Sequence, residues 1–573
     1  MSSARLRFPV TFLVLMSPHV KRFGLLLLVM AAVYLAGNGR TQLFDRDEPR
    51  YAQCSRQMLQ SGDWVVPRLY DNIRAAKPPG IYWCQAAAMK VLGDNAFAAR
   101  LPSAIAAVLT ALLLGLMVWR EVGARHAVWS AFILASSLLM IFSGKSSMTD
   151  SVLLLCITLG QGCVYLLWQR RGGWPAVIAL AVAIGCGGLV KGPFILGVLG
   201  ATAAMLGALA WFDARCSRLN RPDIVPEIDP DRVPPFRLPI VLLKSIAGLL
   251  IVAAIVLPWV WLVRHRAPEF LTAAKADAMH HLESGAEGHK GPPGYHLGLI
   301  WFTFLPWSVL LPLAIALAFK HRQNRPIRFA LAAVLGTWIF VEILQTKLPH
   351  YILPAFPPLA FLTADAIIRC LDGEQQDLQS KVMLVAARVL AGTILVLSIV
   401  PWWLLAFKFH AFPWTGLISL AVFGALYAVC VCYFFDSRRP RLALVSMGCG
   451  SLGLALLLFS LYLPKSQPLR LPIRVAGVLI AHGITHPHEA VMFEYKEPSL
   501  AFYQGGTIRE YDQSLATLAG SSDAARWAVI PKWVWDQATP ETRSVFEIIG
   551  PTLKGLDYSD ALKTADVMVL RRK

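Results

Sequence analysis

The chain has 573 residues, of which 56% are hydrophobic and 16% are charged, and its formal net charge is +19. Its mean hydropathy of +0.54 is that of a polytopic membrane protein and excludes an ordinary soluble enzyme. The basic excess alone would suit a nucleic-acid-binding protein, but most of it lies in short loops between apolar runs, so we expect no nucleic-acid partner.

Thirteen apolar stretches each approach the roughly 20 residues that a helix needs to cross a bilayer. The sequence therefore predicts a polytopic α-helical membrane protein with about 13 transmembrane helices. The predicted spans are residues 23–37, 97–119, 127–143, 151–168, 175–190, 194–212, 241–262, 296–319, 327–345, 350–370, 384–407, 415–435 and 441–462.

The loops between these spans differ in their basic residues. One set carries pairs and clusters such as Arg120 with Arg125 and Arg170 with Arg171. The short loops of the other set carry one lysine each: Lys145, Lys191, Lys347 and Lys408. By the positive-inside rule the N-terminus is cytoplasmic, and thirteen crossings leave the chain after about residue 464 on the outer side.

Two long segments are expected on the outer side. Residues 38–96 contain two stretches, 48–60 and 80–92, that predict amphipathic helices lying at the membrane surface. Residues 264–295 are polar and rich in histidine and glycine, which favours a mobile loop that closes over a substrate.

The pattern changes after residue 463. Short strand-like runs alternate with helix-like segments, and the alternation predicts a small outer α/β domain over residues 464–573, beside a membrane domain over residues 1–463. The strand-like runs are 491–493, 527–530, 545–549 and 567–570, and the helix-like segments are 473–482, 498–503, 511–518 and 533–537.

Charged groups gather at four places on the predicted outer face. They lie in residues 45–51, 75–83, 146–150 and 347–354, and Lys191 forms a weaker fifth position. Each group also has a simpler interpretation: a carboxylate can cap a helix, a lysine can snorkel to the interface, and an aromatic ring can anchor there. The coincidence on one face of two carboxylate positions with several lone cations nevertheless indicates the handling of a lipid phosphate.

The histidines of the second outer segment raise the question of a metal. His265, His281 and His289 are the candidate ligands, but no pair shows zinc-ligand spacing in a regular element. Solvated or gating histidines are the competing interpretation. The sequence identifies no cofactor with certainty, and it leaves open whether a divalent cation takes part.

Four of these segments resemble a known family. They are residues 47–52 (DEPRYA), 56–67 (RQMLQSGDWVVP), 77–83 (KPPGIYW) and 347–354 (KLPHYILP). They are similar to the polytopic GT-C glycosyltransferases related to protein O-mannosyltransferases, and most closely to the group that transfers aminoarabinose to lipid A. One position departs from that pattern, because Ala76 stands where the group has a glutamate before the lysine.

The resemblance implies an inverting transfer at the periplasmic face of the bacterial inner membrane. The sugar would be 4-amino-4-deoxy-L-arabinose, the donor undecaprenyl phosphate and the acceptor a phosphate of lipid A. The product would lower sensitivity to cationic peptides such as polymyxin, and the enzyme would act as a monomer.

The resemblance implies a place at the reaction centre for Asp47 and Asp150 and a grip on the donor phosphate for Lys77, helped by Arg264 or Arg266; the other candidates come from their place in the outer-face segments. The catalytic candidates are Asp47, Glu48 and Asp150; the candidates for the donor phosphate or lipid are Lys77, Tyr82, Arg264, Arg266, Lys347 and Tyr351; the acceptor candidates are Arg50, Lys191 and His350. A phosphate monoester acceptor has a second pKa of about 6 and needs no strong base, so Asp47 is expected to orient it.

Two alternatives remain at this stage. One is a polyprenyl-phosphate mannosyl- or glycosyltransferase that acts on protein or on another glycan, which would need a true general base for a hydroxyl acceptor. The other is a secondary transporter, which would need charges near the membrane midplane, whereas Arg100 and Glu342 lie near the ends of their spans.

Overall fold

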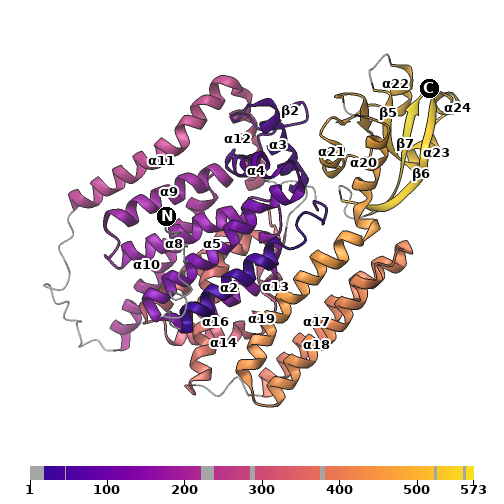
Figure 1. The fold of residues 1–573 in the computed structure, drawn as a ribbon. Helices are drawn as coiled ribbons and strands as arrows, with labels where there is room; N and C mark the ends of the chain where they lie inside the picture. The colour runs from indigo at the N-terminus through magenta and orange to yellow at the C-terminus, as the bar shows by residue number, and fades with distance from the viewer. Residues whose placement is uncertain are drawn as a thin grey trace, which may run out of the picture.

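The computed structural model describes residues 18–44, 47–220, 238–283, 291–374, 381–484, 486–521, 525–558 and 563–573. Within these residues eleven helices are long and apolar enough to cross a membrane, and up to thirteen spans result when each bent helix pair is taken as one. The predicted polytopic helical fold is confirmed (Figure 1).

The predicted spans each correspond to a helix or a bent pair. The single spans are α2 (Pro18–Leu35), α5 (Ala96–Val122), α8 (Asp150–Trp168), α9 (Gly173–Lys191), α10 (Phe194–Asn220), α11 (Leu238–Arg266), α15 (Arg325–Ile343), η3 with α16 (Pro349–Ala355 and Phe356–Leu371), α17 (Lys381–Phe409), α18 (Trp414–Asp436) and α19 (Pro440–Leu457). The pair α6 (Ala124–Ser136) and α7 (Leu138–Gly144) bends by 70°, and the pair α13 (Tyr295–Thr303) and Trp307–Lys320 bends by 116°.

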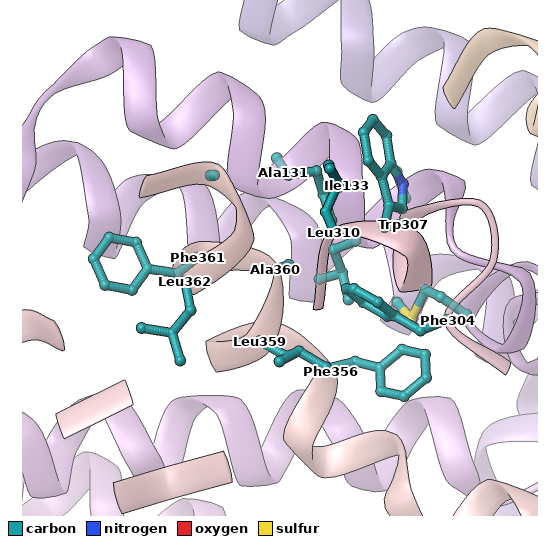
Figure 2. Packing of buried hydrophobic residues seen from close by; sticks show 14 of the residues in the cluster. Ala131, Ile133, Phe304, Trp307, Leu310, Phe356, Leu359, Ala360, Phe361 and Leu362 are labelled. Atoms are coloured by element: carbon teal, nitrogen blue, oxygen red, sulfur yellow. The ribbon is translucent and has the colours of Figure 1, made fainter. Parts of the chain in front are cut away.

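Helix α16 lies at the centre of the membrane domain, since all its residues from Phe356 to Ile368 are buried inside the protein. Phe356 at its start packs edge-on against Phe304, with 5.1 Å between ring centroids. Figure 2 shows this packing beside Trp307, whose indole N–H donates a 3.0 Å hydrogen bond to Ser136 Oγ of α6. A buried indole needs such a partner, so this contact fixes the bent segment after α13 against α6.

The first outer segment folds much as predicted. It forms α3 (Asp47–Ser61), a hairpin of β1 (Arg68–Leu69) and β2 (Asn72–Ile73), and α4 (Gly80–Leu92). The helix positions match the predicted stretches 48–60 and 80–92.

The second outer segment differs from the prediction, because residues 268–283 form a helix, α12 (Pro268–Glu283), rather than a loop. Ala273, Ala274, Lys275 and Ala276 are good helix formers. Phe270 is buried against Trp259 of α11, with 5.6 Å between ring centroids. The histidines and glycines of this segment led to the prediction of a loop, although Phe270 anchors a helix there.

The C-terminal part carries a five-stranded sheet in the order β4-β3-β5-β7-β6. Its strands are β3 (Ala490–Met492), β4 (Arg509–Glu510), β5 (Trp527–Pro531), β6 (Phe546–Asp557) and β7 (Lys563–Arg572). Its helices are α20 (Leu471–Ala481), α21 (Pro498–Gln504), α22 (Leu515–Gly520), α23 (Lys532–Gln537) and α24 (Pro540–Val545). Strand β3 pairs in parallel with β4 and β5, while β7 runs antiparallel to β5 and β6. The two-residue strand β4 was not predicted.

The five-stranded sheet and helices α20 to α24 together are called the sheet domain below. This domain docks directly on α3 (Figure 1). The guanidinium of Arg56 lies 4.1 Å from the ring centroid of Phe502 in α21 and donates to the Phe502 carbonyl at 2.5 Å. Arg509 of β4 forms a 2.8 Å ion pair with Asp71 of the β1–β2 hairpin. Helix α3 therefore contacts both the membrane domain and the sheet domain.

Candidate active site

An ion pair joins two helix ends on the side of the membrane domain that the basic loops predict to be the outer one. Asp150 is the first residue of α8, Lys191 is the last of α9, and Lys191 Nζ donates to Asp150 Oδ1 at 2.7 Å. Both side chains are more than nine-tenths buried. The placement also suits the helix dipoles, since a carboxylate stabilises an N-terminus and an ammonium a C-terminus.

The segment after α15 adds two side chains to this pair. His350 Nε2 lies 3.8 Å from Asp150 Oδ1, and the Lys191 ammonium lies 4.7 Å from the ring centroid of Tyr351. Residues Pro349–Ala355 form a 3₁₀ turn, η3, because Pro349 and Pro354 fix the backbone there. The sequence could not show that these residues face α8 and α9.

The second carboxylate position lies at the start of α3. Asp47 is 38% exposed, and its Oδ1 is 3.9 Å from Arg74 Nη2. The Arg74 guanidinium lies 5.6 Å from the ring centroid of Tyr51, which packs against Tyr82 with 5.7 Å between centroids. Burial raises the pKa of the Tyr82 phenol, so this group stays protonated at neutral pH.

Lys77 interacts electrostatically with members of both groups, namely Lys191, Asp47 and Arg74. Its ammonium donates to the Ala76 carbonyl at 2.8 Å, the one hydrogen bond seen for it within the described chain, so two N–H groups remain for a ligand. Burial and the nearby charge of Lys191 lower the pKa of Lys77, while Asp277 and Asp47 oppose that effect. A partly buried cation with two N–H groups left for a ligand would bind an anion.

Two residues of this centre were missed in the sequence analysis. Arg74 precedes Lys77 by three positions. Its position just before the segment KPPGIYW could have identified it as a candidate. Asp277 belongs to α12, which was expected to be a loop, and its charge acts on both Lys77 and Tyr351.

Glu48 has a different environment from its neighbour Asp47. It forms a two-point ion pair with Arg100, at 3.0 and 2.8 Å, and both side chains are buried. Its oxygens also accept from the backbone N–H of Phe44 and Ser147, each at 2.6 Å. Its catalytic role stays a prediction, and the occupied oxygens favour a structural role in fixing the start of α3.

Lys347 lies in a separate buried group. Its ammonium donates to Glu342 Oε2 at 2.6 Å and to the Glu342 carbonyl at 2.7 Å. Glu342 also accepts from the backbone N–H of His296 at 2.9 Å. These contacts join α13 to the segment that begins at Lys347, so the predicted contact of Lys347 with a donor phosphate finds no support in this geometry.

The remaining candidates lie at the edges of the site. Arg264 and Arg266 are exposed at the end of α11, and Arg266 is 3.4 Å from Asp63. Arg50 lines a cavity beneath the sheet domain. His265 is exposed and lies 2.7 Å from the Trp261 carbonyl through Nδ1.

The structure gives little support for the proposed metal ligands. The side chain of His281 and all of residue 289 lie outside the described residues. Among the residues whose placement is described, no group of three or more His, Cys, Asp or Glu side chains could hold a metal ion.

Comparison with known sequences gives consistent matches. The model of the family described as dolichyl-phosphate-mannose-protein mannosyltransferase matches residues 22–274. The undecaprenyl phosphate-alpha-4-amino-4-deoxy-L-arabinose arabinosyl transferase of Serratia proteamaculans is 31% identical over 389 residues, which cover 66% of this chain and 64% of the relative. The Yersinia enterocolitica protein of the same name is 31% identical over 61% of this chain and 59% of its own length. The alignments thus span about three fifths of these relatives.

Comparison with solved structures extends over nearly the whole chain. ArnT from Cupriavidus metallidurans bound to undecaprenyl phosphate has a TM-score of 0.71 at 20% identity and covers 96% of this chain and 97% of its own. The same protein in the apo state has a TM-score of 0.72 at 19% identity, with 97% and 98% covered. These likenesses confirm the fold, in which many apolar helices precede a small C-terminal sheet.

Proposed function

We propose that this multi-pass, ArnT-like GT-C protein is an inverting glycosyltransferase that moves 4-amino-4-deoxy-L-arabinose from undecaprenyl phosphate to a phosphate of lipid A. The reaction would take place at the periplasmic face of the inner membrane. The observation that carries the proposal is the convergence of charges from four segments: Asp47 begins α3, Lys77 precedes α4, and the Asp150–Lys191 ion pair joins α8 to α9. The names of the relatives support the choice of sugar and lipid donor.

The cations suit the leaving group. As the glycosidic bond breaks, the polyprenyl phosphate gains negative charge, and a preorganised cation stabilises it. Lys77 has two N–H groups available for this phosphate and interacts with the charges of Lys191, Asp277 and Asp47. Lys191 is held by Asp150, so its charge is positioned without being exposed to solvent.

The acceptor determines what Asp47 must do. A lipid A phosphate is already ionised near neutral pH, so Asp47 orients it, with Arg74 3.9 Å away to balance the charge. Two phosphates approaching to about 5 Å repel by roughly 3 kcal/mol at an effective dielectric constant of about 20, so more than one cation is needed. The added sugar carries an amine, which reduces the negative charge that attracts cationic peptides.

The rival reaction transfers a sugar to a hydroxyl of a protein or another glycan. It would require Asp47 to act as a general base. The discriminating experiment assays the purified full chain with undecaprenyl-phosphate-linked aminoarabinose and either lipid A or lipid A stripped of its phosphates. Transfer restricted to the phosphorylated lipid is expected. Undiminished transfer to the stripped lipid would replace this proposal with the hydroxyl-acceptor reaction.

A further inference from the structure

A polar cavity of about 980 Å³ lies where the sheet domain meets α3. Arg50 of α3 forms one wall, and the other walls come from the sheet domain. Arg50 follows Asp47 by three residues, which is less than one helical turn and a rise of about 4.5 Å. The cavity therefore begins beside the candidate reaction centre.

The sheet-domain walls all come from one edge of the sheet. Glu494 and Lys496 follow β3, Glu510 ends β4, and Lys532 and Trp533 follow β5. These three strands are parallel, so their carboxyl ends meet at the same edge. Residues from the end of β6 and the start of β7 complete the wall because β7 is antiparallel to β5 and β6.

This edge contains a topological switch point. The chain leaves β3 toward β4 on one side, whereas β5 lies on the other side of β3 and continues toward β7 and β6. The segments after β3 and β5 therefore diverge and leave a crevice between them. Open α/β sheets bind their ligands in such crevices, outside the carboxyl ends of the strands.

The lining indicates the chemistry of the ligand. Among the described residues it contains four cationic and five acidic side chains, so the charges nearly balance. Lys532 and Asp536 form an ion pair of 2.6 Å within it. Such a surface offers many donors and acceptors but little net attraction for an anion. The ring of Trp533 is 52% exposed and provides an apolar face beside these polar groups.

We infer that this cavity binds a saccharide and holds the sugar chain of the glycolipid acceptor while the acceptor phosphate lies at Asp47. This inference rests on the proposed function, since it takes the acceptor to be a glycolipid. A sugar ring presents a C–H face that packs on an indole, and hydroxyls that bond to carboxylates and ammonium groups. Arg50 lines the cavity and lies three residues after Asp47, so it links the saccharide site to the reaction centre.

The test compares two acceptors with the full chain: lipid A alone, and lipid A that still carries its sugar chain. Trp533→Ala removes the exposed ring, and Glu494→Gln removes an exposed wall charge. Ile548→Ala is the matched control, because it trims an exposed hydrophobic side chain on β6 outside the cavity. The KM for the sugar-bearing acceptor should rise about fivefold in Trp533→Ala, with kcat and the use of bare lipid A unchanged.

A direct binding measurement separates this inference from the proposed function. Dephosphorylated oligosaccharide released from lipopolysaccharide should bind the wild-type chain and the Ile548→Ala variant but bind Trp533→Ala about fivefold more weakly. If this pattern holds while neither lipid acceptor is glycosylated, the saccharide site stands and the proposed function fails. Equal binding by all three proteins, an equal KM change for both acceptors, or displacement of the oligosaccharide by inorganic phosphate would overturn the inference.

Discussion

Lys191 at the end of α9 donates a 2.7 Å hydrogen bond to Asp150 at the start of α8, and this buried ion pair joins the two helices at the candidate active site. Removing one partner leaves the other charge buried and unpaired, which costs about 3–5 kcal/mol. The pair is therefore both a structural contact and a means of positioning charge.

The first prediction separates these two roles. Asp150→Asn should lower the thermal stability of the purified protein, whereas the double variant Asp150→Asn with Lys191→Met should recover most of that stability without recovering transfer. The physical reason is that the double variant leaves no unpaired charge but still lacks the cation. Thermal unfolding and transfer rates measure the two effects. Restored transfer in the double variant would show that the pair is only structural.

A second prediction distinguishes Asp47 from its neighbour Glu48. Asp47→Asn should fold normally, because Asp47 is 38% exposed, and should reduce transfer by about 100-fold or more. Glu48→Gln should destabilise the protein, by up to about 3–5 kcal/mol, since it breaks the buried pair with Arg100. Membrane expression and thermal unfolding provide the check. A stable but inactive Glu48→Gln variant would instead place Glu48 in the catalytic machinery.

The third prediction concerns Lys77. Lys77→Ala should reduce transfer by about 10²–10³-fold, because no other group would replace its contact with the donor phosphate. The loss should appear in single-turnover rates with donor saturating. Wild-type activity in this variant would remove Lys77 from the site.

A fourth prediction uses the lowered pKa of Lys77, which burial and the charge of Lys191 cause. Below that pKa the Lys77 side chain is a cation that binds the donor phosphate, and it loses this charge as the pH rises through the pKa. Transfer should therefore decline at a lower pH than it would with an ordinary lysine. Lys77→Arg should abolish this decline in its residual activity. The free energy of unfolding should change in the opposite sense, rising with pH between the lowered pKa and 10.5, because the unfolded chain binds the extra proton there.

A fifth prediction tests orientation. In a background without native cysteines, Ala481→Cys, exposed at the end of α20, should react with an impermeant thiol reagent added to the periplasm. Asp223→Cys, in the basic loop expected in the cytoplasm, should react only after the membrane is permeabilised. The reverse pattern would invert the assignment and move the candidate site to the cytoplasmic face.

Local patterns in the sequence predicted much of the architecture. The lengths of the apolar runs located every span, because a bilayer sets the length of a crossing helix. Some elements were not predicted. The histidines and glycines near residues 268–283 favoured a loop where the chain forms α12, and a two-residue strand such as β4 is too short to give a periodic pattern.

The sequence by itself determined which charges were unusual, namely Asp47, Lys77, Asp150 and Lys191 at the ends of apolar or amphipathic segments. Only the tertiary structure decided what each one does. The ion pairs depend on which segments meet in the folded chain. The tertiary structure pairs Lys191 with Asp150, Glu48 with Arg100 and Lys347 with Glu342. The first two of these pairs join residues 41 and 52 positions apart, and such contacts follow from packing, which no local pattern in a single chain encodes.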